Sequence, residues 1–269
     1  MKHLPSIRKI PDELWDEIKI ILPPEKANNT TGRPVISFRK VLNGILYILR
    51  TGCQWKMLPK EYGSGSTCHR RFQEWVLSNV FQKLWVRLLK LYDDLRGIKW
   101  TWQSLLDSVS VKAPLGGDDV GPNPTDTGSK IGTKRHLLTD QYGVPLSVVI
   151  TAANTHDMKA ATETLDRTVV KRPLKNQNLC LDKGHDYPEI ERESTKRRYV
   201  SHIRHKGVEK ELIKIEYVTK RWVVIERTNS WWHNRFRKLL VRYEKKSENY
   251  LTLVYLACCI IVYRRIVLG

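Results

Sequence analysis

The sequence predicts an α/β protein in which an all-helical part, residues 1–98, precedes a sheet-containing part, residues 99–269. Apolar residues recur at helical spacing throughout the first part. After Lys99, short runs typical of β-strands alternate with helical stretches. The hydrophobic fraction of 41% supplies enough apolar side chains for a core and excludes a disordered chain.

Positive charge is spread over both parts of the chain. The 47 Lys and Arg residues against 28 Asp and Glu give a net charge of +19. Through Lys99 the count is 18 against 9, or +9, and beyond it 29 against 19, or +10. A basic surface repels itself unless an anionic partner covers it. We therefore expect nucleic acid as the partner of both parts, with a membrane surface as the second candidate.

Composition also predicts the compartment and the state of the cysteines. Charged residues interrupt the first 20 residues, which excludes a secretory signal and predicts the cytoplasm. The longest apolar run, Leu251–Tyr263, is shorter than the roughly 20 residues that cross a bilayer. It predicts a buried helix that ends at Arg264 and Arg265. The five cysteines form no C-x-x-C pair, so neither a disulfide framework nor a zinc site is expected.

Four helices are expected in the first part. Their predicted ranges are Asp12–Leu22, Phe38–Arg50, Thr67–Leu77 and Val80–Leu95. Pro23 and Pro24 end the first helix, and Ser37 caps the second. Short helices joined by glycine-containing turns fit a helix-turn-helix-like DNA-binding domain and also a plain helical bundle. The positive charge, with Arg70 and Arg71 near the start of the third helix, favours DNA binding.

The second part is predicted to contain five strands. Their ranges are Ser104–Val111, Lys134–Thr139, Pro145–Ala152, Asn178–Asp182 and Tyr199–Arg204. A helix over Asp157–Val170 follows the third strand, and a long helix begins near Val223 after the fifth. This order of elements is that of the ribonuclease H-like fold, a mixed five-stranded sheet with flanking helices.

Three acidic residues fall where such a sheet can hold metal ions. Asp107 lies in the first strand, Asp182 ends the fourth, and Glu226 begins the long helix. Phosphodiester cleavage uses two divalent cations about 3.5–4 Å apart, and hard cations bind carboxylate oxygens. Asp107 interrupts an apolar strand and is costly to bury unless it binds a cation. Taken alone, Asp182 also fits a turn, and Glu226 also fits a helix N-terminus.

The predicted helix after Glu226 is strongly basic. A helical wheel places Arg235, Lys238, Arg242 and Lys245 on one stripe and Arg237 on the face of Glu226. A solvated basic face is the alternative interpretation. Contact with phosphates is favoured because Arg227–Lys246 contains a single acidic residue, Glu244. Glu244 ranks behind Glu226 as the third carboxylate.

Basic residues from both parts are expected to hold DNA. The candidates are Arg39, Lys40, Arg70, Arg71, Lys112, Lys130, Lys134, Arg135, Arg235, Arg237, Lys238, Arg242 and Lys245. The glycine-rich stretch Leu115–Gly132 does not match a phosphate-binding P-loop and is predicted to be an insertion between the first two strands. His156-Asp157 and His185-Asp186 could be metal ligands, but turn or helix-cap roles are favoured.

In combination, the motifs of the second part resemble a DDE transposase of bacterial insertion sequences, of the insertion sequence five type. The matching stretches are WTWQSLLDSVSVKAPLGG, GPNPTDTGSKIGTKRHLLTD, GVPLSVVITAANTHD, LCLDKGHDY and RWVVIERTNSWWHNRFRKLLVRYEKKSENYL. In the first part, GRPVISFRKVLNGILYILRTGCQWKMLP resembles the DNA-binding region of the same family.

This resemblance implies a function and a set of site residues. Asp107, Asp182 and Glu226 would be the catalytic triad, holding two Mg²⁺ ions that Mn²⁺ could replace in vitro. The partners would be double-stranded DNA, as terminal inverted repeats and target, and further copies of the chain in a dimer or larger assembly. Where related enzymes carry Tyr, Arg and Lys around the glutamate, this chain has Thr219, Trp222 and His233.

Two other functions fit the same sequence. One is a former transposase retained as a DNA-binding protein without catalysis, and the other is a structure-specific nuclease with the same fold. Cleavage of labelled end DNA in the presence of Mg²⁺ distinguishes the first of these from a transposase. Membrane binding, the second candidate on charge alone, gains no support from the motifs.

Overall fold

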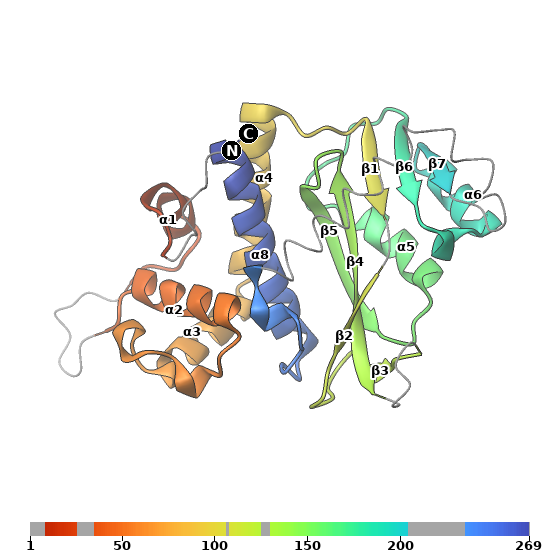
Figure 1. Ribbon diagram of the computed structural model, residues 1–269. Coiled ribbons are helices and arrows are strands. Elements are labelled where there is room, and N and C mark those ends of the chain that lie inside the picture. Colours follow the sequence, from red (N-terminus) through yellow and green to blue (C-terminus); the bar gives the residue numbers. More distant parts are fainter. Residues whose placement is uncertain (1–8, 26–34, 106–107, 125–129, 204–234, 269) are drawn as a thin grey trace.

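The computed structural model describes residues 9–25, 35–105, 108–124, 130–203 and 235–268. A mixed sheet of seven strands stands beside a pair of long helices, α4 and α8, and the shorter helices α1–α3 lie on the other side of this pair (Figure 1). The helical first part and the sheet-containing second part are therefore as predicted.

The four predicted helices of the first part are present. They are α1 (Asp12–Lys19), α2 (Phe38–Thr51), α3 (Gly65–Leu77) and α4 (Val80–Arg96). Ser37 caps α2 as predicted, because its hydroxyl accepts a hydrogen bond from the backbone N–H of Lys40 at 3.4 Å. Gly52 ends α2 in the left-handed conformation with φ of 74°, which glycine adopts without steric cost.

The connection between α2 and α3 is longer than a simple turn. It contains two 3₁₀ helices, η1 (Trp55–Met57) and η2 (Lys60–Tyr62), within residues 52–64. A helix-turn-helix motif uses a turn of about three to four residues. The helix-turn-helix-like arrangement of this part therefore stays a prediction.

The sheet brings distant strands together in a defined order. Its members are β1 (Trp102–Leu105), β2 (Val109–Lys112), β3 (Gly121–Pro122), β4 (Ile131–Asp140), β5 (Pro145–Ala152), β6 (Gln177–Leu181) and β7 (Tyr199–Ile203). The order across the sheet is β5-β4-β1-β6-β7, with β4 antiparallel to β5 and β1, and β1, β6 and β7 mutually parallel. The predicted first and fourth strands are therefore neighbours.

One predicted strand is divided. The first, Ser104–Val111, consists of β1 and β2, which both pair with β4. Leu105 pairs with Leu138 and Val109 pairs with Arg135, so the registers of β1 and β2 against β4 differ by one residue.

Helices cover both faces of the sheet. α5 (Asp157–Asp166) packs on β4 and β5, and α6 (Pro188–Lys196) packs on β7. α8 (Ser247–Leu268) contacts β5 from the other face. The alternation of β4 shows this, because Lys134 reaches Asp157 of α5 and its neighbour Arg135 reaches Tyr250 of α8. The helix predicted over Asp157–Val170 is shorter in the structure, because α5 ends at Asp166.

The apolar C-terminal helix is longer than predicted. α8 continues past Arg264 and Arg265 to Leu268. Arg265 donates to the carbonyl of Tyr142 at 2.8 Å and so contacts the β4–β5 turn. By length and composition alone α8 could cross a membrane, with a mean hydropathy of 2.0 over its most apolar window. Of that window, 56% is buried inside the protein.

A continuous apolar core joins the two parts. α8 packs along α4 (Figure 1). The rings of Trp85 and Tyr255 lie 5.4 Å apart between these helices. The same cluster of buried residues extends to Leu138 and Leu181 in the sheet. The domain boundary between residues 98 and 99 stays a prediction, and the core is shared across it.

Replacing the fully buried Trp85 with alanine tests this shared core. We expect Trp85→Ala to lower the free energy of unfolding by about 3–5 kcal/mol, because a large cavity would remain between α4 and α8. Urea denaturation followed by circular dichroism and by tryptophan fluorescence should give one coincident transition. Met57→Ala, at an exposed position, is the control. Separate transitions for helices and sheet would contradict a shared core.

Candidate active site

Three strands of the sheet run in the same direction, and two of them, β1 and β6, end side by side at one edge. β5 and β1 are both antiparallel to β4, and β6 is parallel to β1, so β1, β5 and β6 share a direction. Leu105, the last residue of β1, pairs with Leu181, the last residue of β6. Asp182 follows β6 directly at this edge. Asp107 and Glu226, the other predicted catalytic residues, lie outside the described residues.

The carboxylate of Asp182 is available to a ligand. Its side chain is partly exposed, and no described side chain donates a hydrogen bond to it or forms an ion pair with it. Carboxylate oxygens are the donors that hard divalent cations prefer. Asp182 therefore fits the predicted metal-binding role. Among the described residues alone, no group of three His, Cys, Asp or Glu side chains could hold a metal ion.

A second carboxylate, Asp157, lies at the same edge of the sheet. It begins α5, the helix that follows β5, and its Oδ1 accepts hydrogen bonds from Ser108 Oγ at 2.6 Å and from Lys134 Nζ at 3.1 Å. Lys134 Nζ also donates to the carbonyl of Thr155 at 2.9 Å. His136 Nδ1 lies 3.9 Å from the same carboxylate oxygen. Asp157 is thus held by groups from β4 and from the residue before β2.

The charge states of this cluster follow from its surroundings. Burial raises the pKa of Asp157, but the hydrogen bonds from Ser108 and Lys134 outweigh it, and the pKa lies below the usual value. Burial lowers the pKa of His136 to about 4, against the attraction of Asp157. Burial likewise lowers the pKa of His185. Near neutral pH the cluster therefore contains an ionised Asp157 beside uncharged imidazoles.

The two His-Asp pairs of the sequence have different roles in the structure. His156 caps α5, accepting a hydrogen bond from the backbone N–H of Met158 at 3.3 Å, so the favoured cap role is confirmed. His185 lies in the short helix η3 (Lys183–His185) and is buried. The ion pair of Asp157 with Lys134 was not foreseen. The available signal was the parallel direction of β1, β5 and β6, which brings the residues after them together.

The predicted basic helix does not extend through residues 236–246. Arg235 is helical, a 3₁₀ turn η5 (Arg237–Leu239) follows, and Val241 forms a parallel bridge with Lys112. The helical wheel is therefore wrong over this range. The reason is backbone pairing, because the N–H of Arg242 donates to the carbonyl of Lys112 at 2.8 Å.

Three predicted DNA-binding residues are buried, which corrects their predicted place on a phosphate-facing surface. The guanidinium of Arg242 donates to the carbonyls of Glu244 and Lys245 at 2.9 and 3.0 Å. Arg135 donates to the hydroxyl of Tyr250 at 3.3 Å. Lys238 forms an ion pair with Glu244 at 3.0 Å, with 5% and 8% of the two side chains exposed. Buried charges require such partners, and these cations serve the fold. Glu244, so paired, is not available as a third metal ligand.

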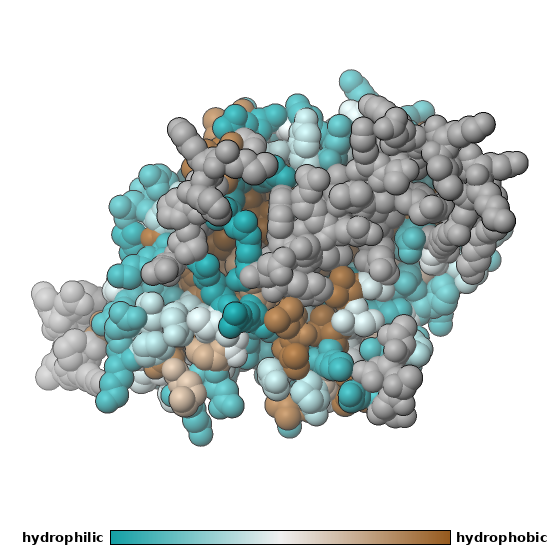
Figure 2. All heavy atoms as spheres, viewed as in Figure 1, coloured by the Kyte–Doolittle hydropathy of each residue, from teal (hydrophilic) through white to brown (hydrophobic). Residues whose placement is uncertain are grey.

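Three further candidates are held by acidic neighbours. Arg39 pairs with Asp12, Arg71 pairs with Glu74 at 2.6 Å, and Lys134 pairs with Asp157. The exposed candidates are Lys40, Arg70, Lys112, Lys130, Arg235, Arg237 and Lys245. Figure 2 shows mainly hydrophilic side chains over helices α1–α3 at lower left. Contact of the exposed residues with DNA stays a prediction.

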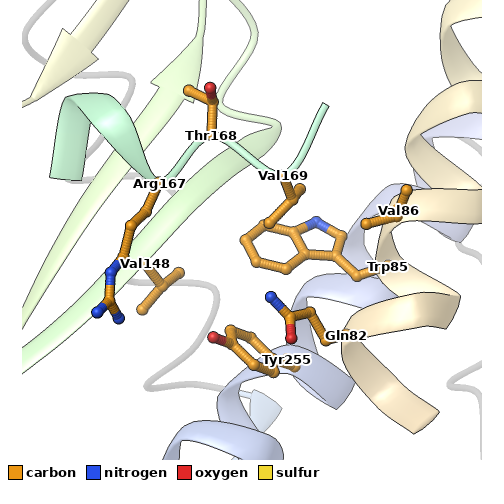
Figure 3. Close-up of a pocket in the computed structure, with 8 residues that line it drawn as sticks. All are labelled: Gln82, Trp85, Val86, Val148, Arg167, Thr168, Val169 and Tyr255. Atoms are coloured by element: carbon orange, nitrogen blue, oxygen red, sulfur yellow. The ribbon is translucent and has the colours of Figure 1, made fainter. Parts of the chain in front are cut away.

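A cavity of about 390 Å³ lies between α4, α8 and the chain that follows α5 (Figure 3). Its lining residues are Gln82, Trp85, Val86, Val148, Arg167, Thr168, Val169 and Tyr255. Arg167 follows the C-terminal end of α5, whereas Asp157 begins this helix, roughly 15 Å away along its axis. The cavity is therefore separate from the carboxylates.

Sequence models of two families match the chain. One described as "Transposase DDE domain" matches residues 101–262, and one described as "Putative transposase of IS4/5 family" matches residues 10–85.

Two proteins of Burkholderia cepacia are similar to this chain. "Insertion element IS402 uncharacterized 16.2 kDa protein" is 38% identical over 119 residues, covering 43% of this chain and 80% of that protein. "Putative transposase for insertion sequence element IS402" is 32% identical over 154 residues, covering 53% and 67%. A solved structure titled "Crystal structure of the Mos1 Strand Transfer Complex" aligns over 90% of this chain and 81% of that chain, with 9% identity and a TM-score of 0.26, which is too low to carry an argument.

The motifs, the sheet and the family models together define the class of protein. The chain belongs to the DDE transposases, and within them to the IS4/5 type. The family predicted from the motifs is confirmed.

The buried pair of Lys238 and Glu244 allows a test of its structural role. We expect Glu244→Ala to lower the free energy of unfolding by about 3–5 kcal/mol, because it leaves the ammonium of Lys238 buried without a partner. The double variant Lys238→Met/Glu244→Leu should regain most of this loss, since it removes both charges. Urea denaturation measures both effects, with the exposed Glu248→Ala as control. If Glu244→Ala and the double variant had the same free energy of unfolding, the structural role of the ion pair would be contradicted.

Proposed function

We propose that this transposase binds the terminal inverted repeats of its own insertion sequence, hydrolyses a phosphodiester bond at each end, and transfers the freed 3′ strand to target DNA. Membership of the DDE transposase family supports the transposition of DNA. One structural observation supports the cleavage chemistry: the partly exposed Asp182, to which no described side chain donates a hydrogen bond, follows β6 beside the strand that leads to Asp107.

The second part would be a ribonuclease H-like catalytic domain. The order of its strands across the sheet supports this, since the strand before Asp107 lies between its antiparallel neighbour β4 and its parallel neighbour β6. Such an order places the ends of the first and fourth predicted strands together. The sheet topology thus agrees with the fold predicted from the order of elements.

Asp107, Asp182 and Glu226 would hold two Mg²⁺ ions, with Mn²⁺ able to replace them in vitro. Bound there, the two ions would activate the attacking oxygen and stabilise the leaving oxygen. The role of the three side chains is to supply carboxylate oxygens at a fixed separation. An acidic site in a protein of net charge +19 repels DNA until cations neutralise it, so binding of DNA at this site should depend on the metal.

The exposed basic residues would bind phosphates from both parts of the chain. Lys40 and Arg70 belong to α2 and α3 of the predicted helix-turn-helix-like domain, and Lys112 and Lys130 flank the loop before β4. Positively charged side chains that contact phosphates release counterions, so the affinity should fall steeply with salt. Because two ends must be brought together, we infer a dimer or larger assembly, acting in the cytoplasm.

Substitution of Asp182 tests the catalytic assignment. Asp182→Asn should bind labelled inverted-repeat DNA as the wild type does but should lose nicking in Mg²⁺, because a metal-binding oxygen is removed while the shape is retained. Gel shift and denaturing gels measure the two steps, and the exposed Asp94→Asn is the control. Normal nicking by Asp182→Asn would contradict the assignment. A wild type that shifts DNA but never cuts it would indicate a DNA-binding protein without catalysis, and cutting only of branched DNA would indicate a nuclease.

Substitution of Arg70 tests the DNA-binding role of α3. Arg70→Ala should weaken binding to end DNA and reduce the slope of log affinity against log salt by about 1, as expected for the loss of one phosphate contact. Fluorescence anisotropy over a salt series measures both quantities. Lys90→Ala, which removes an exposed charge from α4, should leave them unchanged. Equal salt slopes for Arg70→Ala and the wild type would show that Arg70 does not contact a phosphate.

A further inference from the structure

Asp157 lies between the two chain segments that follow the predicted catalytic aspartates. Its Oδ1 accepts the hydroxyl of Ser108, the residue after Asp107, at 2.6 Å. Its Oδ2 is turned toward Gly184, two residues after Asp182: a Cβ atom built on this glycine would lie 3.4 Å from Oδ2, at ordinary van der Waals distance. The buried imidazole of His185, the next residue, interacts electrostatically with the same carboxylate. One carboxylate group is therefore hydrogen-bonded to the first segment and lies beside the second.

The position of this carboxylate is itself fixed. Asp157 is the first residue of α5, and the preceding His156 caps the helix. The ammonium of Lys134 joins Asp157 Oδ1 to the carbonyl of Thr155, so β4 and the turn before α5 are tied at the same point. Only 19% of the Asp157 side chain and 14% of the Lys134 side chain are exposed, which limits screening by solvent.

Asp157 and Lys134 lie where side chains that support metal ligands, without touching the ion, would be expected. Side chains that support metal ligands orient them, and their loss lowers metal affinity even though they do not touch the ion. Two-metal chemistry requires ions about 3.5–4 Å apart, so the separation of the segments that bear the ligands must be held closely. A clamp between Ser108 and the Gly184 turn acts on that separation.

We propose that Asp157 is a positioning residue, which holds the Ser108 segment and the Gly184 turn at a fixed separation and thereby sets the geometry in which Asp107 and Asp182 bind divalent cations. This role rests on the proposed function, because it acts through the carboxylates assigned there. Lys134, predicted from the sequence to contact DNA, instead keeps Asp157 ionised and in place.

A graded set of variants tests the clamp on the full-length protein. Asp157→Ala removes the carboxylate and leaves the ammonium of Lys134 without an acidic partner, whereas Ser108→Ala removes a single hydroxyl and is the milder change. Ser108→Thr retains the hydroxyl. Asp166→Asn removes a carboxylate at the far end of the same helix and is the matched control. Asp182→Asn reports whether the cation binds at the catalytic carboxylates.

The main measurement is Mn²⁺ binding to the protein without DNA, followed by the electron paramagnetic resonance signal of the free ion. We expect Asp157→Ala and Ser108→Ala to weaken Mn²⁺ binding by about 10–100-fold. Ser108→Thr should restore it, and Asp166→Asn should not change it. Melting temperatures identify any variant that fails to fold, and nicking of end DNA should require more Mg²⁺ in the affected variants.

The outcomes separate the clamp from the proposed function. Wild-type Mn²⁺ affinity in a folded Ser108→Ala or Asp157→Ala variant, together with loss of binding in Asp182→Asn, would reject the clamp alone. Absence of Mn²⁺ binding by the wild type would reject both proposals. Equal losses in Ser108→Ala and Ser108→Thr would also reject the clamp, because the hydroxyl would not be the group that matters.

Discussion

The pairing of β1 between antiparallel β4 and parallel β6 is the constraint on which the rest of the structure depends. It places Leu105 beside both Leu138 and Leu181, so that the chain reaches Asp107 and Asp182 from neighbouring strands. A parallel pair needs a crossover between its strands, and here the crossover from β5 to β6 contains α5. Since β5 runs in the direction of β1, α5 begins at the same edge, and Asp157 arrives beside the segments it contacts.

The positive charge of the chain is divided between two uses. Three cations have their partners inside the protein. Arg135 donates to the hydroxyl of Tyr250, Lys238 pairs with Glu244, and Arg242 donates to backbone carbonyls. Arg135 thereby ties β4 to the segment before α8 and to α8 itself, and Lys238 and Arg242 hold that segment together. We propose that the exposed cations contact DNA, and the ion pair with Lys134 offsets the negative charge of Asp157. The carboxylate of Asp182 remains partly exposed to solvent.

Local pattern was sufficient for most elements of the fold. Ser37 as a cap, the strand Pro145–Ala152 and the carboxylate after the fourth strand could all be predicted, because each depends on residues within one or two turns of chain. The prediction failed where partners are distant in sequence. A helical wheel could not show that Val241 pairs with Lys112, a contact that overrides the local periodicity, nor that Arg265 contacts the β4–β5 turn.

The sequence by itself determined the chemistry of the candidate residues, the order of the elements and, through its motifs, the family. These follow from residue type and spacing, which do not change on folding. The tertiary structure decided which charges face solvent and which groups meet. Burial turned three predicted DNA-binding cations into internal partners, and parallel strand direction brought Asp157 to Ser108 and Gly184. Both outcomes depend on how distant segments pack, because the tertiary fold decides which cations are buried and brings Asp157 to Ser108, 49 residues earlier in the chain.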